Sequence, residues 1–361
     1  MAIALFDSRT ALEPLRPRID ASIAEVVESG AFILGPNVEA FETEFAEAIG
    51  SRHAVGVANG TEAITIALRA LGVGPGDEVI VPSFTYFASA EAIPALGAVP
   101  VFCDVDPETF VSGPEHVKAV MTPKTKAVVA VHLFGNVAPV REIEALGVPV
   151  VEDTAQAAGS TGPDGNPGAI GTIATHSFYP SKNLGAFGDG GAITTSDDAL
   201  AERVRMLRFH GSRDKVVYEE AAYNSRLDEI QAAVLRAMLP ELAGWAGHRL
   251  AAGERYREAL ADVVATPVAT PGASPAWHLY VIRTPEPDAL AEGLAERGIE
   301  ARGYYRVPVH LQPAMECWHG ADAVLPGTDE AARTHLALPI SATIGDDQVD
   351  EVAAAVQELL A

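Results

Sequence analysis

The sequence predicts an α/β protein with a mostly parallel sheet, and two observations carry this prediction. From residue 53 onward, short β-branched runs alternate with helical stretches, which is the pattern of strands joined by crossover helices. Several runs are apolar on both faces, as in Val128–Val131, which is typical of a sheet covered by helices on each side. We therefore expect a large domain built on a sheet of about seven strands flanked by helices.

Two helices are expected before the sheet, within residues 18–49, because apolar residues recur there at helical spacing. Gly30 ends the first helix and Pro36 precedes the second. The expected strands are His53–Ala58, Glu78–Pro82, Val99–Val105, Ala127–Leu133, Val148–Asp153, Ile173–Phe178 and Gly191–Thr195. Residues 225–262 are expected to form one or two long helices.

A stretch rich in proline and glycine, residues 266–275, predicts a domain boundary. We therefore expect a large domain over residues 1–262 and a small C-terminal α/β domain over residues 263–361. The small domain is predicted to hold a strand at Trp277–Ile282, a helix at Asp288–Arg297, a strand at Ile299–Tyr305 and a final helix from Asp346.

Composition excludes several classes of function. The chain has 361 residues, 48% of them hydrophobic, and a formal net charge of -24. This charge argues against binding to nucleic acid and to an anionic membrane surface, and no apolar run is long enough to span a bilayer. The two cysteines form no CxxC pair and the first residues do not resemble a signal peptide, so we expect a cytoplasmic protein.

The segment Asn59-Gly60-Thr61 lies where a predicted strand ends and an amphipathic helix begins. Free N–H groups at a helix start bind anions, and a glycine lets a ligand approach the backbone. The segment therefore suits a phosphate. An ordinary capped turn, with Asn59 or Thr61 capping the helix, is the alternative.

Asp153 ends the apolar run that begins at Val148. Ligands of open α/β sheets bind at the carboxyl ends of the strands, and a buried carboxylate there needs a cationic partner. A protonated pyridine nitrogen is such a partner. A Mg²⁺ ion or a helix N-terminus would serve as well, so this segment alone leaves the partner open.

Lys182 is one of only five lysines, and four glycines follow it between residues 185 and 191. A desolvated lysine has a lowered pKa and attacks carbonyl groups, although a lysine reaching solvent from a strand end is the simpler alternative. Together, an anion-binding helix start, an acid and a lysine are the three contacts that pyridoxal phosphate requires. We therefore predict that Lys182 carries this cofactor as a Schiff base, and we expect no metal.

The spaced motifs make the chain resemble the fold-type I enzymes that use pyridoxal phosphate, and among them the DegT/DnrJ/EryC1/StrS family of sugar aminotransferases. The likeness runs from about Phe32 to the C-terminus. The segments that carry it are Gly72–Ile80, Pro82–Tyr86, Glu152–Ala157, Ser177–Lys182 with Gly188–Gly191, Asn224–Ala233, Pro308–Pro313 and Leu338–Ile340.

The resemblance implies roles for the matched positions. Gly60, Thr61 and Ser177 would hold the phosphate of the cofactor. Tyr86 would stack on the pyridine ring, Asp153 would pair with its nitrogen and Gln156 would bind its phenolic oxygen. Asn224 would reach the phosphate in the neighbouring subunit of a homodimer. Phe32, Tyr305 and His310 would line the sugar pocket, with a structural role for His310 as the equal alternative.

The resemblance also implies a reaction. We expect transfer of an amino group from L-glutamate to a nucleotide-linked keto-deoxysugar, with the freed Lys182 amine moving the proton. In the sugar 3-dehydrase branch the lysine is replaced by histidine, so Lys182 indicates transamination. The alternatives are a cyclitol ketone such as an inosose as the acceptor, and a regulatory protein that binds the cofactor without turnover. A nucleotide-binding dehydrogenase is disfavoured because no GxGxxG follows the first strand.

Overall fold

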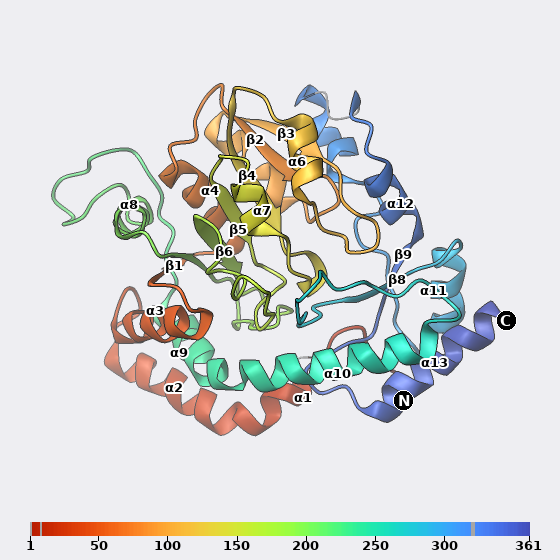
Figure 1. The fold of residues 1–361 in the computed structure, drawn as a ribbon. Helices are drawn as coiled ribbons and strands as arrows, with labels where there is room; N and C mark the ends of the chain where they lie inside the picture. Colours follow the sequence, from red (N-terminus) through yellow and green to blue (C-terminus); the bar gives the residue numbers. More distant parts are fainter. Residues whose placement is uncertain (1, 8, 319–321) are drawn as a thin grey trace.

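The computed structural model describes residues 2–7, 9–318 and 322–361. Its centre is a seven-stranded sheet with the strand order β1-β7-β6-β5-β4-β2-β3 (Figure 1). Within these residues β7 is the one strand that runs antiparallel to its neighbours in this sheet, and the other neighbouring pairs are parallel. The predicted α/β fold with a mostly parallel seven-stranded sheet is confirmed. The strands are β1 (His53–Val57), β2 (Glu78–Pro82), β3 (Val99–Cys103), β4 (Thr125–Val131), β5 (Val150–Asp153), β6 (Ile173–Ser177) and β7 (Gly191–Thr195).

Helices surround this sheet and link it to the C-terminal part of the chain. The α-helices are α1 (Arg9–Leu12), α2 (Arg16–Ser29), α3 (Pro36–Ile49), α4 (Gly60–Ala70), α5 (Ala88–Glu91), α6 (Pro114–Val120), α7 (Val140–Glu144), α8 (Asp198–Leu207), α9 (Glu229–Met238), α10 (Leu242–Leu260), α11 (Pro287–Glu296), α12 (Pro326–Thr334) and α13 (Asp346–Leu360). Short 3-10 turns occur at Glu13–Leu15, Pro94–Leu96, Leu133–Gly135, Leu239–Glu241, Val309–Leu311 and Pro313–Trp318. No helix in the described part of the chain combines the length and the apolar character needed to cross a membrane.

Both faces of the sheet are buried. Successive side chains of a strand point to opposite faces, and each face packs into its own hydrophobic cluster. Val129 of β4 packs in one cluster with Leu68 of α4. Val128 packs in another with Val117 of α6 and Ile143 of α7. This explains the continuous apolar runs in the sequence, since a strand covered on both sides has no polar face.

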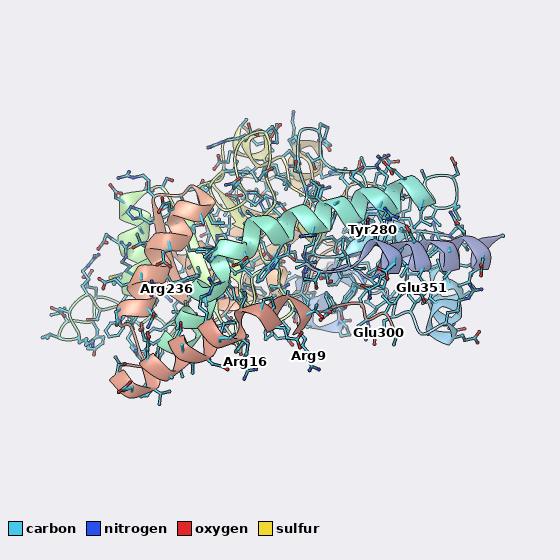
Figure 2. The ribbon with its side chains drawn as sticks, turned by 90° about the horizontal axis from the view of Figure 1, so that it is seen from below. Arg9, Arg16, Arg236, Tyr280, Glu300 and Glu351 are labelled. Carbon is cyan, nitrogen blue, oxygen red and sulfur yellow. The ribbon has the colours of Figure 1, made fainter. Side chains whose placement is uncertain are left out.

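Helices α2 and α3, which precede the large sheet in the sequence, and α9, which follows it, form a layer beside the sheet. Figure 2 views this layer from below. Gly30, with a φ of 67°, ends α2 as expected. Arg236 of α9 pairs with Glu44 of α3 at 2.7 Å and donates to Asn37 at 2.8 Å. The buried Glu229 accepts from the backbone N–H of Val38 at 2.9 Å, at the start of α3. Part of the Asn224–Ala233 motif therefore serves to dock α3.

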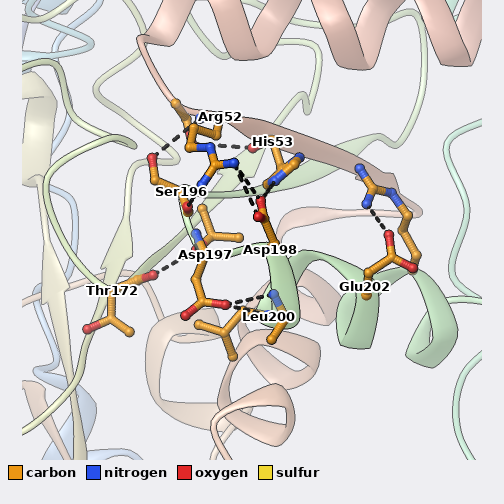
Figure 3. Close-up of polar contacts among 12 residues, drawn as sticks. Arg52, His53, Thr172, Ser196, Asp197, Asp198, Leu200 and Glu202 are labelled. Carbon is orange, nitrogen blue, oxygen red and sulfur yellow. Dashed lines mark hydrogen bonds and ion pairs between the residues drawn. The ribbon is translucent and has the colours of Figure 1, made fainter.

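Polar contacts attach α8 to the edge of the sheet (Figure 3). Asp197 caps α8 by accepting from the backbone N–H groups of Ala199 and Leu200 at 2.8 and 3.0 Å. Asp198 receives Arg52 at 3.0 Å and His53 at 2.7 Å, from the start of β1. These contacts fix the strand that leads into the Asn59-Gly60-Thr61 segment.

The C-terminal part holds a two-stranded sheet of β8 (Tyr280–Arg283) and β9 (His335–Leu338). The prediction of a strand at Ile299–Tyr305 is wrong. The partner of β8 is β9, which was not predicted. Arg302 forms only an isolated bridge to Ala337, and Tyr305 has a φ of 61°, which ends extended backbone.

The long helix α10 joins the two parts of the chain, and Figure 1 shows it running beneath the large sheet toward α13. Tyr256 of α10 stacks on Tyr280 with ring centroids 4.9 Å apart. Ile3 lies in the same hydrophobic cluster. The C-terminal core therefore recruits residues from outside 263–361, and the division at residue 262 stays a prediction.

Candidate active site

A cavity of about 950 Å³ opens at the edge of the sheet where the parallel strands end. This is where open α/β sheets bind ligands. Its walls come from the start of α4, the loop after β2, the ends of β5 and β6, and the segment 304–312. The predicted site residues that line it are Gly60, Thr61, Tyr86, Asp153, Gln156, Ser177, Lys182 and Tyr305.

The start of α4 presents free backbone N–H groups to this cavity. The side chain of Asn59 caps the helix by accepting from the N–H of Glu62 at 2.8 Å, and the Asn59 carbonyl accepts from Ala63. The N–H groups of Gly60 and Thr61 precede the helical ladder and have no partner within it. A Cβ on Gly60 would lie 2.6 Å from the Cβ of Ser177. Glycine is therefore required for the close approach of helix start and strand end.

Asp153 stands at the carboxyl end of β5, buried to 6% exposure. Its Oδ2 accepts from the Ser89 hydroxyl at 2.7 Å, and its Oδ1 accepts from the backbone N–H of Ala155 at 3.1 Å. These bonds hold the carboxylate in place against the cavity that it lines.

The neighbouring Glu152 points to the other face of the sheet and supports the site from behind. Its buried carboxylate accepts from His132 at 2.9 Å and from the backbone N–H groups of Gly168, Ile170 and Gly171 at 2.7–3.0 Å. Burial alone would raise the pKa of Glu152, but the hydrogen bonds from His132 and the amides outweigh it and lower that pKa. Glu152 therefore stays charged and fixes the loop before β6.

Lys182 lies in the loop after β6 and lines both the main cavity and a smaller one of about 260 Å³. Burial lowers the pKa of Lys182 to about 8, and the charge of Asp153 acts in the opposite direction. A Cβ on Gly185 would lie 2.6 Å from the Pro180 carbonyl oxygen, so the turn that presents the lysine needs this glycine. A lowered pKa leaves a sizeable fraction of free amine near neutral pH.

Gln156, Tyr86 and Tyr305 form a connected part of the cavity wall. The Gln156 side chain accepts from the backbone N–H of Phe134 at 2.7 Å and donates to the Tyr305 hydroxyl at 3.1 Å. Tyr86 is 58% exposed, and its ring centroid lies 6.4 Å from that of Tyr305. Such an exposed aromatic face can stack on a flat ring.

Three predicted residues lie outside the cavity of this chain. Asn224 is exposed, in a short bridge with Phe209. Phe32 is 45% exposed, before α3. His310 is buried with its ring nitrogen bonded to the Ser83 hydroxyl, an arrangement that matches the structural alternative for this histidine.

Sequence reasoning missed Ser89, Ser181 and His278, which also line the cavity. Ser89 lies in an otherwise apolar stretch, and no local pattern marks it. His278 lies 96 residues from Lys182, and burial, with the charges of Lys182 and Arg249, lowers its pKa well below the ordinary value. Ser181 adjoins Lys182 in the sequence, whereas only the folded chain brings Ser89 and His278 to this cavity.

Comparison with known proteins identifies the family. The model of the DegT/DnrJ/EryC1/StrS aminotransferase family matches residues 15–357. The chain belongs to this family. It is an aminotransferase, and aminotransferases of this family use pyridoxal phosphate.

Two curated relatives cover almost the whole chain. A Streptomyces venezuelae protein named dTDP-3-amino-3,4,6-trideoxy-alpha-D-glucose transaminase is 45% identical over 99% of this chain and 96% of its own. A Geobacillus stearothermophilus protein named pleiotropic regulatory protein is 42% identical over 99% of this chain and 98% of its own.

Solved structures of family members have the same fold. The S. venezuelae DesV structure, in complex with a ketimine intermediate, has a TM-score of 0.94 and 44% identity, covering 99% of this chain and 98% of its own. The Bacillus subtilis NtdA structure, with its cofactor PMP bound, has a TM-score of 0.88 and 28% identity, covering 96% of this chain and 82% of its own.

The residues of this chain fit the cofactor of the family. The free N–H groups at the start of α4, with the hydroxyls of Thr61 and Ser177, suit a phosphate. Asp153 supplies a fixed carboxylate for a protonated ring nitrogen, and Lys182 supplies an amine of lowered pKa for an aldehyde. All three groups line one cavity.

Proposed function

We propose that the chain transfers an amino group from L-glutamate to the ketone of a nucleotide-linked deoxysugar, as a cytoplasmic homodimer. The observation that carries the proposal is the convergence of the α4 start, Asp153 and Lys182 on one cavity. The nucleotide-sugar name of the 45% identical relative supports the choice of acceptor.

The residues that line this cavity support a set of cofactor contacts. Gly60, Thr61 and Ser177 would hold the phosphate, and Tyr86 would cover the ring. Asp153 would keep the ring nitrogen protonated, and the remaining N–H of Gln156 would bind the phenolic oxygen. When bound, pyridoxal phosphate supplies an electron sink for the charge left on the substrate carbon.

Lys182 performs the proton transfer. Without the cofactor, burial lowers the pKa of Lys182 to about 8, so this amine gives up its proton more readily than an ordinary lysine does, which suits a general base. The amine takes the proton from the carbon that carries the amino group of glutamate. It would pass that proton to the cofactor carbon that was the aldehyde. In the second half it would move a proton from there to the sugar carbon that receives the amine, so one group would serve both halves of the reaction.

The homodimer places residues of one subunit in the other's site. Exposed apolar side chains support an interface, including Ile33 at 51%, Val216 at 78% and Tyr218 at 59% exposure. The loop that carries Val216 and Tyr218 extends from the body of the chain after α8 (Figure 1). Asn224 follows this loop and reaches the phosphate held by the partner.

The proposed reaction is tested in the reverse direction, from amino sugar to glutamate. The cofactor-loaded protein is given 2-oxoglutarate with dTDP-3-amino-3,4,6-trideoxy-α-D-glucose, with other dTDP-linked 3-amino and 4-amino sugars, or with an amino-inositol. Formation of glutamate with at least one nucleotide-linked sugar is expected, and none with Lys182→Ala. Turnover of the amino-inositol alone, or of nothing, contradicts the proposal.

The test of the shared site uses two inactive variants. Hybrid dimers of Lys182→Ala and Asn224→Ala chains contain one site with both residues intact if Asn224 acts across the interface. Mixing is then expected to restore activity above that of either parent. If Asn224 acts within its own chain, no site is complete and no recovery follows.

A further inference from the structure

The hydrogen bonds around Gln156 fix the direction in which the Tyr305 hydroxyl donates. The backbone N–H of Phe134 can only donate, so the side-chain atom 2.7 Å away is the carbonyl oxygen of Gln156. The other end of that amide is an NH₂ group, which also can only donate, and it lies 3.1 Å from the Tyr305 oxygen. The Tyr305 oxygen therefore accepts.

The proton of the Tyr305 hydroxyl must consequently point elsewhere. Among the described residues no acceptor forms a hydrogen bond with it, and Tyr305 lines the main cavity. Burial raises the pKa of Tyr305 above its ordinary value, with the Asp153 charge acting in the same direction. The hydroxyl therefore stays protonated and offers a donor to whatever occupies the cavity.

The ring of Tyr305 is held in this position from two sides. It stacks on Phe134 with centroids 6.0 Å apart and planes 8° from parallel, and it meets Phe84 edge to face at 5.8 Å. Its backbone φ of 61° is uncommon for a residue with a side chain, and such conformations gather at functional sites. The hydroxyl is thus a preorganised donor.

The position of Tyr305 favours an acceptor on the substrate over one on the cofactor. The residues that fit the cofactor come from the large sheet, from the loops that follow its strands and from the start of α4. Tyr305 instead belongs to the segment that adds Tyr304, Val307 and Gln312 to the cavity wall. Gln156 keeps a second N–H for the phenolic oxygen of the cofactor. That leaves the substrate as the molecule facing Tyr305.

We propose that Tyr305, positioned by Gln156, donates a hydrogen bond to an oxygen substituent of the sugar acceptor. This inference rests on the proposed function. Tyr305 is then a specificity-determining residue, because a site that offers a fixed donor favours substrates with an oxygen at that place over analogues without one.

The test compares Tyr305→Phe with Tyr256→Phe in the cofactor-loaded enzyme. Tyr256 is a matched control, since its hydroxyl makes a buried bond to the Pro339 carbonyl away from the cavity. We expect Tyr305→Phe to lower kcat/KM for the amino sugar by roughly tenfold, with unchanged cofactor absorbance and an unchanged half-reaction with glutamate. Tyr256→Phe should alter only the melting temperature.

Two outcomes overturn the inference. If the wild type and Tyr305→Phe have equal kcat/KM, the Tyr305 hydroxyl does not donate to the substrate. The cofactor absorbance can also be titrated with pH in the absence of substrate. A shift of this titration in Tyr305→Phe would mean that the Tyr305 hydroxyl donates to the cofactor and not to the substrate. A wild type that reacts with no nucleotide-linked sugar refutes the proposed function instead, so the two failures are distinguishable.

Gln156→Glu provides a second, independent check. A carboxylate at this position can only accept, so the Tyr305 hydroxyl would turn toward it and leave the cavity. In that background Tyr305→Phe should add little further loss in kcat/KM, whereas independent roles would make the two losses multiply. If the losses in kcat/KM multiply, Gln156 does not act by positioning the Tyr305 hydroxyl.

Discussion

The hydroxyl of Ser89 donates a 2.7 Å hydrogen bond to Oδ2 of Asp153, the carboxylate that closes β5. Ser89→Ala removes one of the two bonds that position this carboxylate. Because the carboxylate is charged, we expect the dissociation constant of pyridoxal phosphate to rise by about tenfold. Fluorescence titration measures it. Ser112→Ala removes a buried hydroxyl that bonds the Asp104 carbonyl outside the cavity, and it should bind the cofactor normally; equal losses in both variants would exclude a specific role for Ser89.

The contact between Gly60 and Ser177 predicts a strong effect of a single methyl group. A Cβ at Gly60 would lie 2.6 Å from the Ser177 Cβ, so helix start and strand end must separate. We expect Gly60→Ala to weaken cofactor binding by about 100-fold. In Gly74→Ala the added Cβ meets nothing within 4 Å, and binding should be retained. Wild-type affinity in Gly60→Ala would rule out this phosphate site.

The pKa of Lys182 sets the pH dependence of cofactor attachment. The ammonium cannot attack an aldehyde, so in cofactor-free protein the attachment rate should rise with pH and level off above the pKa of about 8. Asp153→Asn removes a charge that raises this pKa and should shift the profile to lower pH. Stopped-flow absorbance records both profiles. A rate that keeps climbing above about pH 9 would mean that the attacking lysine has an ordinary pKa.

The buried Glu152 should matter for stability. Glu152→Gln replaces one accepting oxygen with an NH₂ group that faces N–H donors, so the free energy of unfolding should fall by roughly 3 kcal/mol. Urea denaturation measures this change. Glu142 is exposed on α7, and Glu142→Gln should unfold like the wild type. A similar midpoint for all three proteins would show that Glu152 does not fix the loop at residues 168–171.

Much of the site could be predicted because its signals are local in sequence. Gly60, Asp153 and Lys182 each follow or end an apolar strand, and the carboxyl ends of parallel strands meet at one edge of the sheet. The fold class followed from the same alternation. Family resemblance supplied the roles of Tyr86 and Gln156, which no local rule would assign.

Other features depend on the folded chain. The bond between Gln156 and Tyr305 spans 149 residues, and Tyr305 was placed in a strand that its positive φ rules out. The pairing of β8 with β9 was missed because residues 335–338 give a short apolar run with no distinctive period. Ser89 was missed because it resembles the small residues around it.

Chemical trapping of the cofactor tests directly whether Lys182 carries it. The protein loaded with pyridoxal phosphate is reduced with borohydride, digested and mapped by mass spectrometry. We expect the reduced cofactor on the peptide that contains Lys182, and its loss when excess glutamate is added before the reduction. Label on any of the other four lysines, or no label at all, would contradict the assignment of Lys182.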